Sequence, residues 1–587
     1  QQVRTTKMYR YYYFLCPSCG RHEPFTGKSD CGATISGGAW HEGWFDTPYS
    51  ACNPQSFSYT TSKYYTTSLG AGQVWIFSAG NLNDTSVGTT DATGSASVIE
   101  TGYSTRQWVT KFNTVDRTAT AYRITKAALA SGTCGENLTW VLEENGTLTI
   151  SGTGEMTSSV RWSSYKDSIK TVVIKDGATT IEEGAFRDCK NLTSITIPAS
   201  VTKIGDYAFE KCKSLASITI PEGVTAIPAY AFYNTGIKNY DLPSTLKTIG
   251  EAAFQYCVGM TEIELPEELE VLGSNAFTSS GLTSIRIPGT VKMVGHGAFS
   301  KCSKMTSAVL EEGVITIGAS AFSECTKLMN LELPEGLVTI RQTAFEKCAS
   351  LENVVLPDSV TQIGGNAFSN CTSLSMINYP IKWKEVVDTG ASPFYGCESL
   401  KSIVVPEGVT KIPSAAFSNA QMLKEIVLPS TLIEIGNYAF QRCTGITKID
   451  LPKGLEKIGE GAFNGCTELK SIKVPEKITV IERSTFEDCN NLVNVELPDG
   501  LQTIRERAFR NCSSLGSIYL PNNITMMCDD VFSGCSKLSN VNYPINWKTK
   551  GASSYSYYNS PFTNCSSLTS ITIPEGVTAI PAYAFYN

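Results

Sequence analysis

Four cysteines in the first 55 residues have a spacing that could bind a metal ion: Cys16, Cys19, Cys31 and Cys52. The first two stand in the sequence CPSCG, where a tight turn would direct two thiolates at one tetrahedral Zn²⁺ ion, and the other two could complete the site. Such a zinc ion would be structural, because four protein ligands leave no open position for water. The second pair lacks a CxxC spacing of its own, so His22 and His41 are alternative ligands. Two disulfide bonds in a small exported domain are the alternative to zinc.

Little in the sequence points to catalysis. The chain has three histidines, His22, His41 and His296, and none stands at motif spacing from a nucleophile. The GKS sequence at residues 27–29 lacks the preceding glycine of a phosphate-binding loop. A formal charge of -7 with interspersed signs argues against a nucleic-acid-binding surface, and no run of eighteen apolar residues predicts a membrane span. The sequence therefore predicts a protein that is not an enzyme and does not bind nucleic acid.

Fourteen of the twenty cysteines share another place, three residues after a phenylalanine: Cys189, Cys212, Cys257, Cys302, Cys325, Cys348, Cys371, Cys397, Cys443, Cys466, Cys489, Cys512, Cys535 and Cys565. Disulfides between neighbouring repeats are one interpretation. However, Thr235, Ser280 and Ala420 hold the same place in other repeats, so the position accepts any small side chain. We therefore predict reduced thiols that serve as buried filler. So many free thiols suggest folding under reducing or anaerobic conditions, which would favour zinc in the first 55 residues.

The fourteen cysteines belong to a repeat, which is marked by eighteen phenylalanines: Phe186, Phe209, Phe232, Phe254, Phe277, Phe299, Phe322, Phe345, Phe368, Phe394, Phe417, Phe440, Phe463, Phe486, Phe509, Phe532, Phe562 and Phe585. Thirteen of the seventeen intervals are 23 residues, two are 22, and the others are 26 and 30. A fixed period of this length predicts a solenoid. No coil could bury its apolar face alone, so each must pack on its neighbours.

The unit at residues 190–212, KNLTSITIPASVTKIGDYAFEKC, shows how one coil would fold. Ile195 and Ile197 alternate in a short strand that ends at Pro198, and later apolar residues point inward from the return path. The segment around Phe209 is predicted to form about one turn of helix on the outer side.

The pattern LxxIxIPxxVxxIGxxAFxxC resembles the bacterial BspA-type leucine-rich repeat over about residues 169–587. The resemblance implies a mainly β fold, a parallel-sheet solenoid with short helical turns outside. It also implies a surface-exposed adhesion or ligand-binding protein without a catalytic site in the repeats.

Four parts are expected along the chain. Residues 1–55 would form the four-cysteine head, which resembles a zinc knuckle or zinc ribbon, and residues 56–130 a small β module. Residues 131–168 would form a β-hairpin cap, turning at Asn145-Gly146, and residues 169–587 a solenoid of about 18 coils. Since residues 570–587 repeat residues 217–234 and stop within a coil, more protein is expected beyond Asn587. Residues 1–7 have no hydrophobic signal core, so a leader has been removed or the chain is trimmed.

Two surfaces are candidates for partner binding. The sequences NYPIKWK (378–384) and NYPINWK (542–548) precede the two longest intervals and predict surface loops, with these candidate contacts: Trp383, Trp547, Tyr555, Tyr557 and Tyr558. The alternative is that each tryptophan folds back over its own coil. The second surface is the outward strand row, where three valines predict an exposed apolar patch: Val355, Val404 and Val427. Their β propensity is the alternative explanation.

Together these features predict a non-enzymatic adhesion protein, extracellular on a bacterial surface, that binds a protein or glycan on a host or neighbouring cell. A bacteriophage tail-associated receptor-binding protein is the alternative, since assembly in a reducing cytoplasm would explain the free thiols. An exported enzyme with its chemistry in the first 130 residues is a third possibility.

Overall fold

The computed structural model describes residues 3–15, 22–23, 40–45, 63–68, 73–78, 85–90, 95–100, 117–123, 128–157, 160–388, 391–551 and 559–585. The chain divides into two units, Gln1–Leu129 and Ala130–Asn587.

The first unit contains one antiparallel sheet of eight strands: β1 (Val3–Leu15), β2 (His22–Glu23), β3 (Trp40–Phe45), β4 (Lys63–Ser68), β5 (Gln73–Ser78), β6 (Thr85–Thr90), β7 (Ser95–Glu100) and β8 (Arg117–Arg123). Their order is β2-β1-β8-β5-β6-β7-β4, and β3 also pairs with β1. The long strand β1 pairs with β3 through one half and with β8 through the other. The expected head (residues 1–55) and β module (56–130) therefore share one sheet.

A hairpin covers the start of the second unit. Strands β10 (Asn137–Glu143) and β11 (Thr147–Thr153) pair antiparallel around Gly146, whose φ is +90°, and β9 (Ala128–Thr133) extends the sheet. On the other side, β11 pairs parallel with the first coil strand, β12 (Thr171–Ile174). Leu138, Trp140 and Leu142 are buried, as their alternation indicates. The hairpin thus protects the first coil's apolar end.

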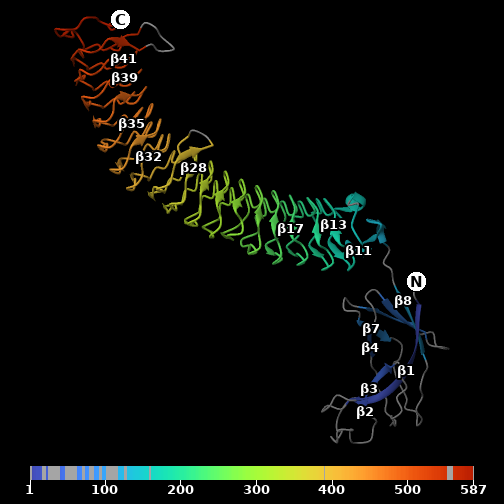
Figure 1. Ribbon diagram of the computed structural model, residues 1–587. Helices are drawn as coiled ribbons and strands as arrows, with labels where there is room; N and C mark the ends of the chain where they lie inside the picture. The colour runs from blue at the N-terminus through green and yellow to red at the C-terminus, as the bar shows by residue number, and fades with distance from the viewer. Residues whose placement is uncertain are drawn as a thin grey trace, which may run out of the picture. The chain divides into compact units, whose positions relative to one another are not determined.

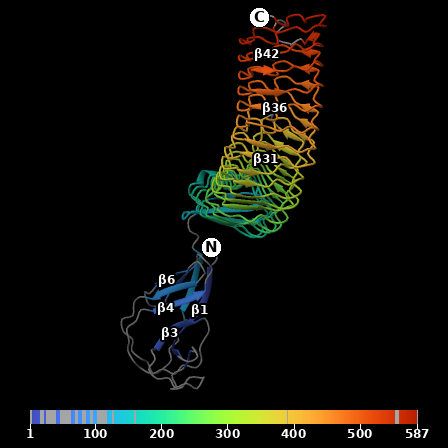
Figure 2. The same ribbon diagram turned by 90° about the vertical axis from the view of Figure 1, so that its left-hand side faces the viewer.

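Most coils of the solenoid contribute short strands to two parallel rows (Figures 1 and 2). The first row continues from β12 with β14 (Ser194–Thr196), β16 (Ser217–Thr219), β18 (Asn239–Asp241), β21 (Ser284–Ile287), β23 (Ser307–Leu310), β25 (Asn330–Glu332), β27 (Asn353–Val354), β29 (Met376–Ile377), β31 (Ser402–Val404), β33 (Glu425–Val427), β36 (Ser471–Lys473), β38 (Asn494–Glu496), β40 (Ser517–Ile518) and β42 (Asn540–Val541). The second row holds β13 (Thr180–Ile181), β15 (Lys203–Ile204), β17 (Ala226–Ile227), β19 (Thr248–Ile249), β20 (Val271–Leu272), β22 (Met293–Val294), β24 (Thr316–Ile317), β26 (Thr339–Ile340), β28 (Gln362–Gly364), β30 (Glu385–Val387), β32 (Lys411–Ile412), β34 (Glu434–Ile435), β35 (Lys457–Ile458), β37 (Val480–Ile481), β39 (Thr503–Ile504), β41 (Met526–Met527) and β43 (Thr549–Lys550). Pairing along the second row continues through eight strands from β17 to β30, whereas first-row sheets of the repeats beyond β14 contain two or three strands.

The repeat phenylalanines form one continuous stack through the core. Every ring lies on the ring of the next coil, with centroids 5.2–6.0 Å apart and interplanar angles of 1–15°. At the cap, Trp162 continues the stack onto Phe186 at 5.8 Å. All the rings except that of Phe585 are buried. The solenoid predicted from their spacing is confirmed.

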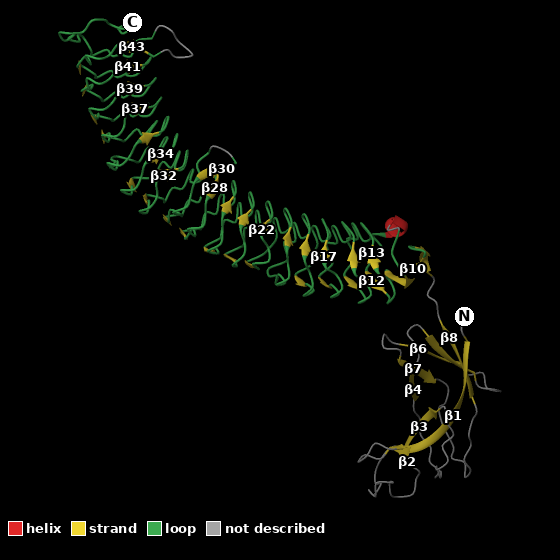
Figure 3. Cartoon of the chain, viewed as in Figure 1, coloured by secondary structure: helices red, strands yellow, loops and turns green. Residues whose placement is uncertain are grey.

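The outer segment of each coil is not helical, which corrects the prediction of short helical turns. Among the described residues the one helix is the 3₁₀ helix η1 (Val160–Tyr165) in the cap, and no helix has the length and apolar character to cross a membrane (Figure 3). Around Phe209, the residues Tyr207 and Lys211 have φ angles of 56° and 60°, so a right-handed helix cannot continue. The amide groups of all three residues donate instead to carbonyl groups of the next coil, over 2.7–3.0 Å. The segment is therefore a third ladder between coils.

Candidate functional site

The first strand row carries an apolar patch on its outward side. Val355, Val404 and Val427 are 76%, 61% and 56% exposed, and the pairing of β31 with β33 sets the last two directly side by side. The residues that alternate with them point into the core, and Ile403 and Ile426 are 3% and 9% exposed. The exposure of the three valines is therefore as predicted. Their β propensity can explain the residue type but does not require a cluster.

Two further residues belong to this patch. Met376, 65% exposed, lies in β29, and Asn378 occupies the outward position between Val355 and Val404. We call these five residues the valine face. Sequence analysis missed Met376 because it stands two positions before the outward residue of its coil. The alternation of outward residues within a strand could have identified it.

The side chain of Asn378 joins two coils. Its Oδ1 accepts a hydrogen bond from the Leu356 amide at 2.6 Å, and its Nδ2 donates to the Leu356 carbonyl at 2.7 Å. Asn542, in the second NYPI sequence, makes the same pair of bonds with Leu520, at 2.7 and 2.8 Å. The amide of Asn378 is therefore already hydrogen bonded within the valine face.

Exposed charges border the valine face at an equivalent place, three residues before the outward position. Glu352 holds this place in the coil of Val355, and Lys401 and Lys424 hold it in the coils of Val404 and Val427. The two lysines lie on neighbouring coils, because the Lys424 amide donates to the Lys401 carbonyl at 2.8 Å. Across the described part of the chain, none of these three side chains forms an ion pair. Like charges on adjacent strands are unfavourable, so the arrangement suits an external partner.

A hollow of about 690 Å³ follows the valine face along the first row. It lies where the strand row is interrupted between β33 and β36, and a single bridge, Lys448 to Ser471, links the two coils there. Lys448 pairs with Asp450 at 2.9 Å, and Lys473 pairs with Glu496 at 2.9 Å, at its rim. Since these charges neutralise one another, the hollow does not select a charged ligand.

The two tryptophans proposed as contact residues are buried, and that prediction is corrected. Trp383 and Trp547 are 3% and 1% exposed, and their indole Nε1 atoms donate to backbone carbonyls within the same coil at 2.9 and 3.0 Å. The ring of Trp383 also packs against that of Phe417 in a T-shaped contact, with ring centroids 6.0 Å apart. Each tryptophan occupies the place of Val201 in the standard repeat, where the larger ring fills a coil widened by the inserted residues. The alternative, that each ring folds over its own coil, describes the structure.

The remaining predicted site residues lie outside the described part of the chain: Tyr555, Tyr557, Tyr558, Cys16, Cys19, Cys31 and Cys52. Among the described residues no cluster of three or more His, Cys, Asp or Glu side chains could hold a metal ion. Structural zinc at the four cysteines therefore stays a prediction.

A buried ion pair lies next to the second insertion. Lys550 Nζ lies 2.5 Å from Asp529 Oδ1, and the two side chains are 9% and 2% exposed.

The repeat cysteines are reduced and buried. Thirteen of the fourteen donate from Sγ to the phenylalanine carbonyl of the preceding repeat, over 3.1–3.3 Å. Burial raises the pKa of Cys302 to about 11 and that of Cys466 to about 12. The thiols of Cys302 and Cys466 are therefore neutral at physiological pH and do not offer reactive thiolates.

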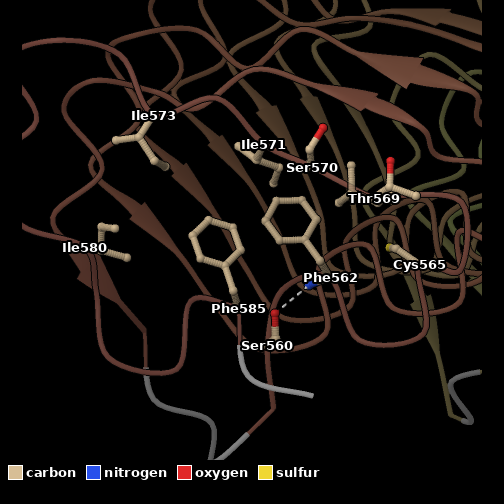
Figure 4. A pocket seen from close by; sticks show the side chains of 10 residues that line it. Ser560, Phe562, Cys565, Thr569, Ser570, Ile571, Ile573, Ile580 and Phe585 are labelled. Carbon is tan, nitrogen blue, oxygen red and sulfur yellow. Dashed lines mark hydrogen bonds between the residues drawn. The ribbon is translucent and has the colours of Figure 1, made fainter.

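A second hollow, of about 410 Å³, lies at the last described coil (Figure 4). It is lined by Phe562, Ile571, Ile573, Ile580 and Phe585, whose counterparts in earlier coils contact the following coil. The hollow is thus the stacking surface of one coil and not a separate ligand site.

Comparison with known proteins gives one family and several similar folds. A family model described as "BspA type Leucine rich repeat region" matches in six copies, over residues 179–306, 292–391, 387–490, 433–561 and 557–587. No curated protein matches the chain.

Three solved structures show the range of similarity. The chain is similar to a leucine-rich repeat protein from Bacteroides ovatus, with 24% identity over 76% of this chain and 94% of that chain and a TM-score of 0.42. A leucine-rich repeat protein from Eubacterium ventriosum has 26% identity over 57% and 95%, with a TM-score of 0.34. A leucine rich cell surface protein from Faecalibacterium prausnitzii has 21% identity over 76% and 95%, with a TM-score of 0.25.

Proposed function

The chain belongs to the BspA-type leucine-rich repeat family, and we propose that it is a non-enzymatic bacterial surface protein that recognises a partner through the valine face. The observation that carries the proposal is the exposure of Val355, Val404 and Val427, at 76%, 61% and 56%. Exposed apolar residues that cluster on a protein surface tend to mark contact sites. The face lies on strands held by the continuous core, so it is presented without a large ordering penalty.

The chemistry of the valine face favours a protein partner over a glycan. Aliphatic side chains cannot replace the water hydrogen bonds of sugar hydroxyl groups, so glycan binding there would leave polar groups unpaired. An apolar protein patch loses no such bonds and gains from the release of water. A glycan bound elsewhere on the solenoid is the other outcome that a binding assay can reveal.

Extracellular display on a bacterium is part of the proposal, and its support is the family. BspA-type repeats are associated with surface proteins, and adhesion or ligand binding fits a long repetitive surface. The comparisons offer no support for the phage tail alternative, since the similar structures named above are bacterial leucine-rich repeat proteins.

The test is a binding assay with the full chain against host matrix proteins, a glycan array and bacterial cells. The triple variant Val355→Ser, Val404→Ser and Val427→Ser is expected to weaken binding at least about tenfold, because central apolar contacts dominate interface energies. Val493→Ser is the matched control, since Val493 is 58% exposed elsewhere on the solenoid. Equal binding by the triple variant and the control would contradict the proposal. Retained circular dichroism would show that both variants are folded.

A further inference from the structure

We propose that the partner of the valine face is a second copy of the same chain, packed face to face with its coils in reverse order. The inference rests on the proposed function of the valine face and names its partner. It arises from the order of residues along the first row, which is acidic at one end of the face and basic at the other.

A twofold axis parallel to the strands generates this pairing. If the axis passes midway between the coils of Asn378 and Val404, Val355 lies opposite Val427 of the second copy, and Asn378 lies opposite Val404. The same contacts then occur twice, because a twofold interface uses one patch on both copies. The apolar residues of the valine face thus cover one another.

The charges at the border select this orientation. The same axis brings Glu352 opposite Lys424 of the second copy, since both stand three residues before the outward position of their coils. Both side chains are exposed, and within the described residues neither has an ion-pair partner. An axis along the solenoid would instead set each coil opposite itself with its strand direction reversed, so Glu352 would not meet Lys424 and this complementary pair would be lost. Charge complementarity therefore favours the reversed order of coils.

The polar groups at the centre do not oppose burial. Both ends of the Asn378 amide are hydrogen bonded to Leu356, so the nitrogen and the oxygen each keep a partner when this residue is covered. One unfavourable pair arises at the edge, where Glu332 lies opposite Asp450 of the second copy. Lys448 moderates it, because its Nζ lies 2.9 Å from the Asp450 carboxylate.

The size of the valine face sets the strength of the association. Four apolar side chains and their border cover a few hundred Å² per copy, below the roughly 800 Å² per partner of a standard interface. We therefore expect a weak, concentration-dependent dimer. Display of many copies on one surface would raise their effective concentration and populate the pairing.

The test is analytical ultracentrifugation of the full chain under reducing conditions, up to roughly millimolar concentration. Wild type is expected to form a reversible dimer. Lys424→Glu and Glu352→Lys should each weaken it about tenfold or more, and the double variant should recover most of the affinity, because it restores the opposite charges. Val404→Asp should abolish the dimer. Lys238→Glu, an exposed lysine away from the valine face, is the control and should have no effect.

Several outcomes would overturn the inference. These are a chain that stays monomeric at every concentration, a dimer unaffected by Val404→Asp, charge-reversal variants that do not compensate, or open-ended oligomers larger than a dimer. A monomeric chain whose valine variants still lose binding to host matrix or cells would refute self-association and leave the proposed function standing. A chain that binds neither itself nor any other protein would refute both.

Discussion

Raising the pH from 8 to about 10 under reducing conditions should unfold the solenoid, because burial raises the pKa of several of its thiols. The pKa values of five of them reach about 12, against an ordinary value of 9.0: Cys189, Cys397, Cys466, Cys528 and Cys565. A thiol with a raised pKa binds its proton more tightly in the folded chain. Its contribution to stability is complete below pH 9 and is lost as the pH rises from about 9 toward 12.

The expected loss is large compared with the stability of a protein domain. One pH unit above the unfolded pKa, each of these thiols should lose about 1 kcal/mol, because one pKa unit corresponds to about 1.4 kcal/mol. Five such sites together lose on the order of 5 to 7 kcal/mol, which is comparable with a typical total stability of about 5–15 kcal/mol. Solvent-exposed thiols would produce no such transition, because their pKa would be the same in the folded and the unfolded chain.

The assay follows circular dichroism, tryptophan fluorescence and the ultraviolet absorbance of thiolates in one pH titration. Thiolates should appear together with unfolding and not before it. Tyrosines titrate in the same range, so the thiol contribution is isolated by comparison with Cys466→Ala, for which Ala420 is the natural precedent. This variant should show about 1 kcal/mol less pH dependence between pH 8 and 10. Thiolate formation near pH 9 with the secondary structure intact, or identical pH dependence of the two proteins, would refute the reasoning.

Three further predictions concern the tryptophans, the buried ion pair and the first 55 residues. Trp383→Ala should lower the free energy of unfolding by about 3–5 kcal/mol in urea titrations, because it leaves a cavity. A normal urea midpoint would show that the ring is exposed in solution. Asp529→Asn should destabilise the chain by about 3–5 kcal/mol in thermal denaturation, since Lys550 would stay buried without its counterion. Adding Lys550→Met should recover most of that loss, and no recovery would contradict a role for the charge. Metal analysis of the full chain should find one zinc ion, lost in the variant Cys16→Ser with Cys19→Ser. Metal-free protein with two disulfide bonds would contradict the zinc prediction.

The periodic part of the fold could be predicted because every coil repeats the same constraint. The spacing of the phenylalanines predicted the solenoid, and the stack of rings confirms it. The variable occupants of the cysteine position predicted reduced thiols. The S–H to carbonyl bonds were not predicted, because they depend on how far adjacent coils are offset.

The local geometry could not be predicted where backbone conformation decides it. AFxxC spacing is compatible with a helical turn, but the left-handed residues Tyr207 and Lys211 redirect the amides to the next coil. Tyr207 and Lys211 are not residue types that favour these φ angles, and the signal lies in other repeats, where Asn, Asp or Gly often holds the place of Lys211. Whether the Trp383 ring would point into the core or toward solvent depended on the backbone path of the inserted residues, and the sequence does not specify that path.

At the candidate site, the sequence identified the outward valines because strand alternation is independent of the details of a coil. It did not identify Met376, nor the Asn378 amide bonds to Leu356. The proposed pairing of Glu352 with Lys424 of a second copy becomes apparent only when the coils are arranged side by side in space.

The hydrogen bonds and ring contacts of the solenoid link each coil with the ones beside it, and this restricts what a genetic change can disturb. A duplicated or deleted coil alters two junctions and leaves the packing of more distant coils as it was. Residues 570–587 are identical to residues 217–234, as expected after duplication of a segment within the gene. Recombination can therefore lengthen or shorten the solenoid by whole coils. The length of its surface would change, while the residues and packing of the remaining coils would stay the same.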